Sequence, residues 1–307
     1  MSETSGAGVT DADGPRPLVG FVGLGRMGRP MAQNLAAAGF PLVVHDADAE
    51  RTARFASEHG CVAADSASSF AGAEVVVTML PDDRAVRDAI LLWDGGIAAA
   101  LARRAVVVDM SSSNPDGTKS LGGELAPLGI GLVDAPVSGG VPRAEAGTLT
   151  LMIGSDDDAA VERVRPALEV LGERVFRTGP LGAGHAMKAL NNLVGGATYA
   201  VVAEALAVGQ RYGLAPGTMV DVMNASTGRS FNTEHVFGEH VVQGRYATGF
   251  ALGLLAKDVS IAAALAGASG VDAPVCELEN RCWADAASSL GAEADHSEAH
   301  KSWWPGG

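Results

Sequence analysis

A lysine and an asparagine lie four residues apart in the stretch GAGHAMKALNNLVGG, residues 182–196. In a helix, residues i and i+4 share one face, so Lys188 and Asn192 would project side by side. A lysine in a partly desolvated cleft holds its proton less tightly and can exchange a proton with a hydroxyl. The Asn192 amide can orient both the lysine and a substrate hydroxyl, and Gly195 and Gly196 would leave space beside them. We predict a catalytic pair; a solvated lysine on a helix face is the alternative.

A second candidate is the short segment Ser138, Gly139 and Gly140, which follows the apolar run LVDAPV. A hydroxyl and several backbone N–H groups would be exposed together there. Such a nest suits a small carboxylate. We therefore predict that these three residues bind the acid group of a substrate, with an ordinary Ser-Gly turn as the alternative.

The segment GLGRMG, residues 23–28, has the GxGxxG spacing. A buried strand precedes it and a helix follows, which is the context in which this spacing binds a dinucleotide. The glycines allow a tight turn, close approach to the pyrophosphate and close packing of helix on strand, while the helix N-terminus attracts the phosphates. A glycine-rich turn without a ligand is the alternative. The predicted cofactor contacts are Gly23, Leu24, Gly25, Arg26, Met27 and Gly28.

An aspartate ends the second apolar run, about 20 residues after the glycines. A carboxylate there accepts hydrogen bonds from ribose hydroxyls and repels a 2′-phosphate, so Asp46 favours NAD over NADP. Arg51 is the counter-indication, because a nearby arginine can reach a 2′-phosphate. Asp46 could instead act as the N-cap of a helix over 48–58.

Two further segments follow the ends of apolar runs, and ligands of doubly wound sheets lie along that edge. Leu80 and Pro81 are expected to support the nicotinamide, and Ser111 or Ser112 to line its site. Capping of a helix over 114–127 is an equally good interpretation of the serines.

These candidate residues need a scaffold, and apolar runs alternate with helical segments over the first part of the chain. This alternation predicts an α/β fold with a Rossmann-type, mostly parallel, doubly wound sheet. Strands are expected at 17–25, 41–46, 74–80, 105–110, 132–137, 148–154 and 173–179, and helices at 29–39, 48–58, 82–92, 114–127 and 157–171.

The character of the sequence changes near residue 180. No convincing strand follows, and helices are expected at 184–212, 216–226, 231–243, 251–267 and 273–290. We predict a disordered lead-in at 1–17, a dinucleotide-binding domain at 18–180, an all-helical substrate and dimerisation domain at 181–300, and a tail at 301–307.

Composition excludes several classes of protein. The formal net charge of −14, without a basic cluster, disfavours nucleic acid as a partner. No uncharged apolar run reaches the ~18 residues of a membrane span. The three cysteines form neither a CxxC pair nor a cluster with histidine, so no zinc site or disulfide framework is indicated. The acidic lead-in lacks the features of a signal or transit peptide, and we expect a cytoplasmic protein.

Taken together, the motifs resemble the β-hydroxyacid dehydrogenase family, which includes 3-hydroxyisobutyrate dehydrogenases, tartronate semialdehyde reductases and relatives of 6-phosphogluconate dehydrogenase. FVGLGRMGRPMAQNL resembles its cofactor motif, DAPVSGGVPRAEAGTLTLMIG its substrate motif, GAGHAMKALNN its catalytic motif, and AKDVSIA its C-terminal Lys-Asp motif. The resemblance places the catalytic lysine at Lys188, the assisting amide at Asn192 and the carboxylate site at 138–140. It also places Lys257 near the substrate and the nicotinamide.

The resemblance implies a reversible, NAD-linked interconversion of a small β-hydroxy acid and its semialdehyde or keto acid. It also implies a homodimer or tetramer built on the long helix, and no metal. Asp46-Ala47 stands where NADP-using members have Asn-Arg, in agreement with NAD. An imine reductase on the same fold is one alternative, although such relatives usually replace the lysine by Asp or Tyr. A non-catalytic NAD(P)-binding protein is the other, against which the intact pair argues.

The sequence does not single out one hydroxy acid. Arg229, Ser230 and Asn232 are candidates for facing the substrate, or for forming a capped loop. ADHS, residues 294–297, resembles a short family signature without a role that we can assign. Phosphogluconate is disfavoured because no arginine cluster for a substrate phosphate is evident.

Overall fold

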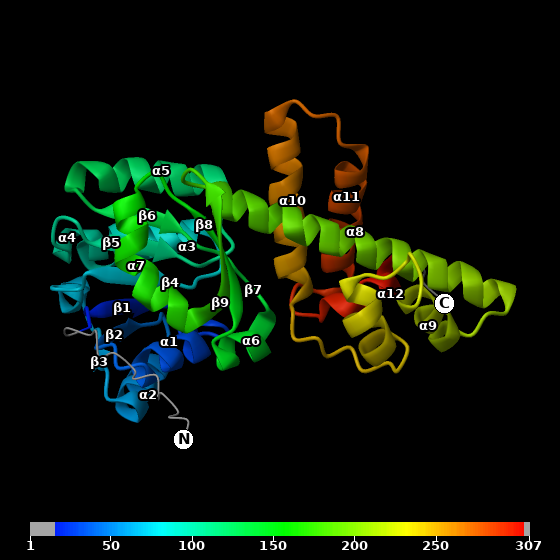
Figure 1. Ribbon diagram of the computed structural model, residues 1–307, viewed down its shortest axis with the longest axis horizontal. Coiled ribbons are helices and arrows are strands. Elements are labelled where there is room, and N and C mark those ends of the chain that lie inside the picture. Colours follow the sequence, from blue (N-terminus) through cyan, green and yellow to red (C-terminus); the bar gives the residue numbers. More distant parts are fainter. Residues whose placement is uncertain (1–15, 304–307) are drawn as a thin grey trace, which may run out of the picture.

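The computed structural model describes residues 16–303; residues 1–15 and 304–307 lie outside the described part, and with them most of the expected lead-in and the last four residues of the expected tail. The described chain forms an α/β domain joined by one long helix to an all-helical domain (Figure 1). This is the predicted fold class.

A nine-stranded sheet forms the centre of the first domain, in the order β3-β2-β1-β4-β5-β6-β8-β7, with β9 also paired to β8. Pairing is parallel from β3 through β6, whereas β8 runs antiparallel to β6 and β7. The strands are β1 (Val19–Val22), β2 (Leu42–His45), β3 (Val62–Ala63), β4 (Val75–Thr78), β5 (Val106–Asp109), β6 (Gly131–Asp134), β7 (Val137–Ser138), β8 (Leu149–Gly154) and β9 (Gly172–Gly179).

Helices cover both faces of this sheet, and an apolar cluster fills each interface. One face is covered by α1 (Gly28–Ala37), α6 (Gly140–Ala146) and α7 (Asp158–Leu171), with α2 (Ala49–His59) beside them. The other face is covered by α3 (Asp83–Arg87), a π-helical turn at Asp88–Leu92, α4 (Ile97–Ala100) and α5 (Pro115–Leu125). The Val-rich central strands are buried on both sides, as a doubly wound sheet requires.

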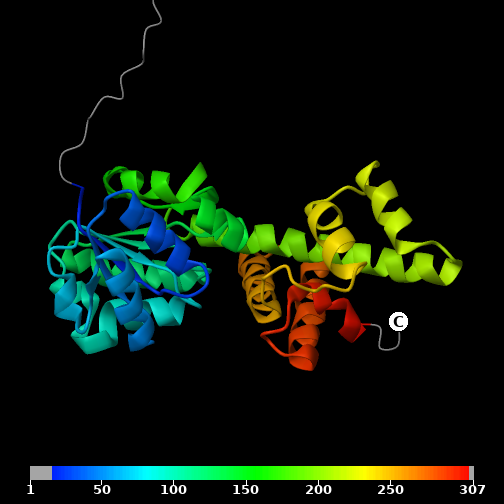
Figure 2. The same ribbon diagram turned by 90° about the horizontal axis from the view of Figure 1, so that it is seen from below.

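The second domain is built around α8 (Ala183–Tyr212), a 30-residue helix that leaves the sheet domain and runs along the whole helical domain (Figures 1 and 2). Its inner face packs on an aromatic core that includes Tyr199, Phe237 and Trp283. The remaining elements are α9 (Pro216–Asn224), a π-helix at Thr233–Val241, α10 (Leu252–Ser269), α11 (Pro274–Leu290) and α12 (His300–Trp303).

The structure differs from the predicted elements at several places, among them the short helices α4 and α6, which were not predicted. The short strand β3 was not predicted, because its two residues are exposed and carry no periodic pattern. The single strand expected at 132–137 is two strands, since the chain leaves β6 after Asp134 and β7 pairs antiparallel with β8. The expected tail begins inside α12, where Trp303 contacts the ring of Trp283 at 5.4 Å between centroids.

Candidate active site

The predicted catalytic helix begins against the carboxyl end of β6. Asp134 accepts hydrogen bonds from the backbone N–H of Gly182 at 2.7 Å and of His185 at 2.9 Å. A carboxylate there satisfies two free N–H groups and opposes the positive end of the helix dipole. Gly184 has no room for a side chain, because a Cβ would lie 2.2 Å from the Met152 carbonyl oxygen. These contacts fix the turn from which Lys188 projects.

Lys188 is partly exposed and makes no hydrogen bond within residues 16–303. Burial of its ammonium group lowers the pKa of Lys188 from its ordinary value. The carboxylate of Asp258 opposes this effect, and the charge of Lys257 adds to it. The lowered pKa is the property that a proton-exchanging lysine needs.

The predicted partner Asn192 is buried and donates from Nδ2 to Oδ2 of Asp258 at 2.6 Å. The other carboxylate oxygen of Asp258 lies 3.3 Å from Nζ of Lys257. Lys257 also donates to the carbonyl oxygen of Ser112 in the sheet domain. The structure therefore brings Lys188, Asn192 and Lys257 around one buried carboxylate at the junction of the two domains.

Asp258 was missed among the predicted site residues. It stands directly after Lys257 in the AKDVSIA motif. A buried aspartate beside a lysine on an otherwise apolar helix was the available signal, since buried carboxylates need partners.

The expected space beside the two glycines on α8 is wrong for Gly196 only. A Cβ on Gly196 would lie 2.8 Å from Nε1 of Trp283, so this glycine allows α8 to pack on α11. Gly195 is exposed, and a Cβ there would meet no atom within 4 Å. Gly196 therefore makes no room for a substrate, whereas the use of the open space at Gly195 stays a prediction.

The predicted carboxylate nest lies between β7 and α6. Gly139 and Gly140 have φ values of 140° and 66°, which L side chains rarely adopt. Ser138 is partly exposed and both glycines are exposed. Strand β7 is at one end of the sheet order, on the side of this domain that faces the helical domain (Figure 1). Their contact with a substrate stays a prediction.

The glycine-rich loop fits a dinucleotide cofactor. A Cβ on Gly28 would lie 1.9 Å from the carbonyl oxygen of Gly23, so helix and strand approach closely, whereas Gly25 has open space around it. Met27 at the N-cap offers no side-chain oxygen to the first turn of α1. No side chain therefore competes with a pyrophosphate for the N-terminus of α1. Leu24 is buried and holds the loop, while Arg26 is exposed.

Asp46 is partly buried at the end of β2. Its Oδ2 accepts from the backbone N–H of Leu24 at 2.7 Å, and its Oδ1 accepts from Nη1 of Arg51 at 3.0 Å. The alternative role as N-cap of α2 is wrong, because Asp48 caps that helix by accepting from the N–H of Arg51. Asp46 thus holds the glycine loop against the end of β2, and its contact with a ribose stays a prediction.

A pocket of about 430 Å³ lies beside this carboxylate. It is lined by Leu24, Gly25, Arg26, Arg29, Pro30, Gln33, Arg51, Arg54 and Glu145. The lining contains four arginines and one carboxylate, Glu145, so the pocket is positive within an acidic protein. This charge favours a dinucleotide and moderates the repulsion of a 2′-phosphate by Asp46.

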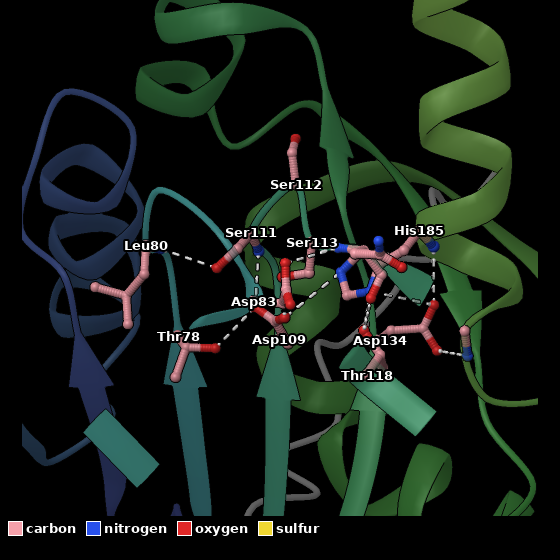
Figure 3. Close-up of polar contacts among 12 residues, drawn as sticks. Thr78, Leu80, Asp83, Asp109, Ser111, Ser112, Ser113, Thr118, Asp134 and His185 are labelled. Atoms are coloured by element: carbon pink, nitrogen blue, oxygen red, sulfur yellow. Dashed lines mark hydrogen bonds and ion pairs between the residues drawn. The ribbon is translucent and has the colours of Figure 1, made fainter. Parts of the chain in front are cut away.

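The loop of residues 111–113 is called the serine loop here, and hydrogen bonds to neighbouring residues hold it in place (Figure 3). The buried hydroxyl of Ser111 accepts from the N–H of Leu80 at 2.9 Å. The serines do not cap α5, because Asn114 does so. Ser111 therefore joins the two loops expected at the nicotinamide, while Leu80 is partly exposed and Pro81 exposed.

The three residues considered for substrate choice form a capped loop. Ser230 and Thr233 bond each other through side chain and backbone. Asn232 is buried and donates to the carbonyl oxygen of Gly195 on α8. Arg229 lies 3.7 Å from Glu234 on the surface. All three residues make contacts with other residues of the protein, which favours a capped loop over a substrate contact.

Comparison with known proteins gives matches along nearly the whole chain. Residues 18–179 match the family described as the NAD binding domain of 6-phosphogluconate dehydrogenase, and residues 182–303 match the NAD-binding of NADP-dependent 3-hydroxyisobutyrate dehydrogenase.

Individual relatives agree with these matches. The chain is 36% identical to 2-(hydroxymethyl)glutarate dehydrogenase of Eubacterium barkeri, over 93% of this chain and 94% of that protein. It is also 36% identical to 3-hydroxyisobutyrate dehydrogenase of Pseudomonas aeruginosa, over 90% and 93%.

Solved structures show the same architecture. Mycobacterium tuberculosis 3-hydroxyisobutyrate dehydrogenase with L-serine superposes with a TM-score of 0.84 at 29% identity, over 94% of this chain and 99% of that one. An imine reductase from Streptomyces aurantiacus shares the fold at 21% identity and a TM-score of 0.59, over 91% and 97%.

Proposed function

Because the chain belongs to the β-hydroxyacid dehydrogenase family, we propose that Lys188 is the proton-exchanging group of its NAD-dependent hydroxy acid dehydrogenase activity. The observation that supports this role best is the position of Lys188. It lies beside a buried Asn192–Asp258 pair at the domain junction, and burial lowers its pKa.

In oxidation, neutral Lys188 takes the proton of the substrate hydroxyl. In reduction, the protonated ammonium returns that proton to the forming alkoxide. The nicotinamide of NAD, when bound, accepts hydride from the carbon that carries the hydroxyl. Asn192 is held by Asp258, so its remaining donor and acceptor positions have a fixed direction.

The chain's own residues supply position and charge. The Ser138 hydroxyl and the N–H groups of Gly139 and Gly140 hold the carboxylate of the substrate. Lys257 joins α10 to the serine loop and contributes positive charge where a carboxylate and a nicotinamide meet. The glycine-rich loop and Asp46 hold the pyrophosphate and the ribose.

The proposed substrates are small acids with a hydroxyl on the β-carbon. 3-Hydroxyisobutyrate leads the series, because relatives with that activity in their names match most of the chain. Glycerate, serine and threonate have the same pair of groups. The imine reductase alternative is disfavoured, since Lys188 is retained and the imine reductase neighbour is more distant.

The exposed face of α8 supports a homodimer. Met187, Leu190, Val194, Val201 and Val208 are 42, 42, 62, 60 and 70% exposed. Their spacing of three, four and seven residues places them in one apolar stripe. A second copy would cover this stripe.

Two helices, α8 and α10, are long and apolar enough to cross a membrane by length and composition. Their polar residues argue for another use, because Lys188 and Asn192 on α8 meet Lys257 and Asp258 on α10 in one site. We therefore propose no membrane partner. All three cysteines are free, which suits a reducing cytoplasm.

The test is the initial rate of NAD and NADP reduction with 3-hydroxyisobutyrate, D-glycerate, L-serine and L-threonate, for wild type and Lys188→Ala. We expect NAD-dependent turnover of at least one acid by wild type and its loss in the variant. An unchanged rate in Lys188→Ala would exclude the proposed role of the lysine. NADH binding without turnover of any acid would exclude this substrate class.

A further inference from the structure

A buried polar cluster lies at the carboxyl ends of the central strands, where α8 begins, and its side chains have no part in the chemistry described above (Figure 3). It joins three neighbouring strand ends, α5 and the first turn of α8. Its members are Thr78, Asp109, Ser113, Thr118, Asp134 and His185, each no more than 3% exposed.

Asp109 holds the sheet side of this cluster. Its Oδ1 accepts from the Thr78 hydroxyl at 2.9 Å and from the N–H of Ser111 at 3.0 Å. Its Oδ2 accepts from the Ser113 hydroxyl at 2.6 Å. A single carboxylate therefore sets the path of the serine loop, whose Ser112 carbonyl accepts from Lys257.

His185 holds the helix side. Its backbone N–H donates to Asp134, and its Nδ1 lies 2.8 Å from the Thr118 hydroxyl. Its Nε2 is buried, has no hydrogen-bond partner within residues 16–303, and lies 3.6 Å from Oδ2 of Asp109. A lone pair on Nε2 would face a carboxylate, so the favourable tautomer carries its hydrogen on Nε2, and the Thr118 hydroxyl then donates to Nδ1 rather than to the carbonyl oxygen of Asn114.

The sheet side and the helix side of the cluster meet at His185, which is three residues before Lys188 in the chain. The His185 ring connects the turn that carries the lysine with the carboxylate that fixes the serine loop. The Nε2–Asp109 distance of 3.6 Å is slightly longer than a hydrogen bond, so a small approach of the ring would complete that bond. Buried polar networks of this kind fix one arrangement of the elements that they join.

We propose that His185 is a positioning residue of the dehydrogenase. Through its Nε2 contact with Asp109, it sets the distance between Lys188 and the serine loop. This inference rests on the proposed role of Lys188. One readout of its test, hydrogen exchange, does not depend on that role.

The test compares three substitutions that remove different parts of the ring. In Gln the amide nitrogen reaches the position of Nε2 and can donate to Asp109. In Asn it reaches only the position of Nδ1 and can bond Thr118, and Leu retains neither contact. His235→Asn, at an exposed histidine, is the matched control.

We expect His185→Asn and His185→Leu to lower kcat by about 10- to 100-fold per folded enzyme, with the KM for NAD within about twofold of wild type. His185→Gln should recover kcat to within about threefold of wild type, since it restores the Asp109 contact. The folded fraction is measured by circular dichroism and NADH binding, so a variant that folds poorly does not count as inactive. The Gln and Asn variants decide the question if the Leu variant does not fold.

Equal kcat for the Gln and Asn variants, or wild-type kcat in all three, would overturn the proposal. Hydrogen exchange of residues 182–188 is the readout that is independent of turnover. Exchange there should be faster in His185→Asn than in His185→Gln, and unchanged in His235→Asn. If wild type oxidises no hydroxy acid, the proposed function fails, while this exchange pattern still decides whether the Nε2 contact holds the turn.

Discussion

Asn192 on α8 donates an amide hydrogen to Oδ2 of Asp258 on α10 at 2.6 Å. This bond joins the helix that carries Lys188 to the helix that carries Lys257. The Asp258 carboxylate raises the pKa of Lys188, whereas Lys257 lowers it. Burial is the largest influence on the pKa of Lys188 and lowers it, and two charges of opposite sign on α10 modify the result. Their removal should have opposite effects.

The first prediction concerns the pH profile of kcat/KM for oxidation. This rate rises as Lys188 loses its proton, so the rise follows the pKa of that lysine. Asp258→Asn removes the carboxylate that raises the pKa and should shift the rise to lower pH. Lys257→Gln removes the neighbouring cation and should shift it to higher pH. Lys301→Gln breaks the exposed pair with Glu298 and should leave the midpoint in place. Shifts of equal sign in the two site variants would contradict the prediction.

The second prediction joins activity and stability at Lys188. Burial lowers the pKa of Lys188, so the folded state disfavours its charged form. This destabilisation is full below the folded pKa and is lost as pH rises toward the ordinary lysine value of about 10.4. Lys188→Met should lower kcat by about 10²- to 10⁴-fold and raise the Tm at neutral pH.

Lys188→Arg is the control for this second prediction, because arginine keeps the charge at every accessible pH. It should be as inactive as the Met variant without the gain in Tm. Thermal melts from neutral to alkaline pH measure the effect. A Tm advantage of the Met variant that grows with pH would contradict it.

Local patterns in the sequence predicted much of this site. The glycine spacing, the aspartate that ends β2 and the Lys188–Asn192 pair each depend on residues close together in the chain. Contacts between distant segments escaped prediction. Asn192 and Asp258 are 66 residues apart, and only the packing of α8 on α10 brings them together.

The cap and the glycine were misassigned for different reasons, one local and one between distant segments. Asp48 rather than Asp46 caps α2, a difference of two residues that the composition of the segment does not decide. Gly196 is small because Trp283, 87 residues later, packs against it. A glycine in a sequence indicates that something lies close to the backbone there. Whether that is a ligand or another side chain cannot be decided until the neighbouring residue is known.

The third prediction concerns the choice between NAD and NADP. Arg51 lies 3.0 Å from Asp46 and 3.3 Å from Asp48, and so offsets negative charge that would repel a 2′-phosphate. Arg51→Ala should raise the KM for NADP about tenfold and change that for NAD about twofold. Arg54→Ala, which lines the same pocket without pairing with Asp46, should discriminate less between the two cofactors. Equal effects of Arg51→Ala on both cofactors would show that Asp46 alone sets the preference.

The fourth prediction compares two glycines of α8. A Cβ at Gly184 would lie 2.2 Å from a backbone oxygen of β8, so Gly184→Ala must displace the first turn of the helix and with it Lys188. Gly195→Ala meets open space and should stabilise the helix by up to about 1 kcal/mol. Urea unfolding and kcat measure both effects. A Gly184→Ala enzyme with wild-type kcat would show that this turn does not position the lysine.

The fifth prediction tests whether a second copy covers the apolar stripe of α8. Val201 is 60% exposed at the middle of that stripe, and a buried unpaired carboxylate at an interface is strongly unfavourable. Val201→Glu should therefore convert a dimer to a monomer in light scattering coupled to size-exclusion chromatography. Val62→Glu, at a valine 55% exposed on β3 and away from α8, should leave the mass unchanged. A wild-type monomer, or a Val201→Glu dimer as stable as wild type, would show that this stripe is not the interface.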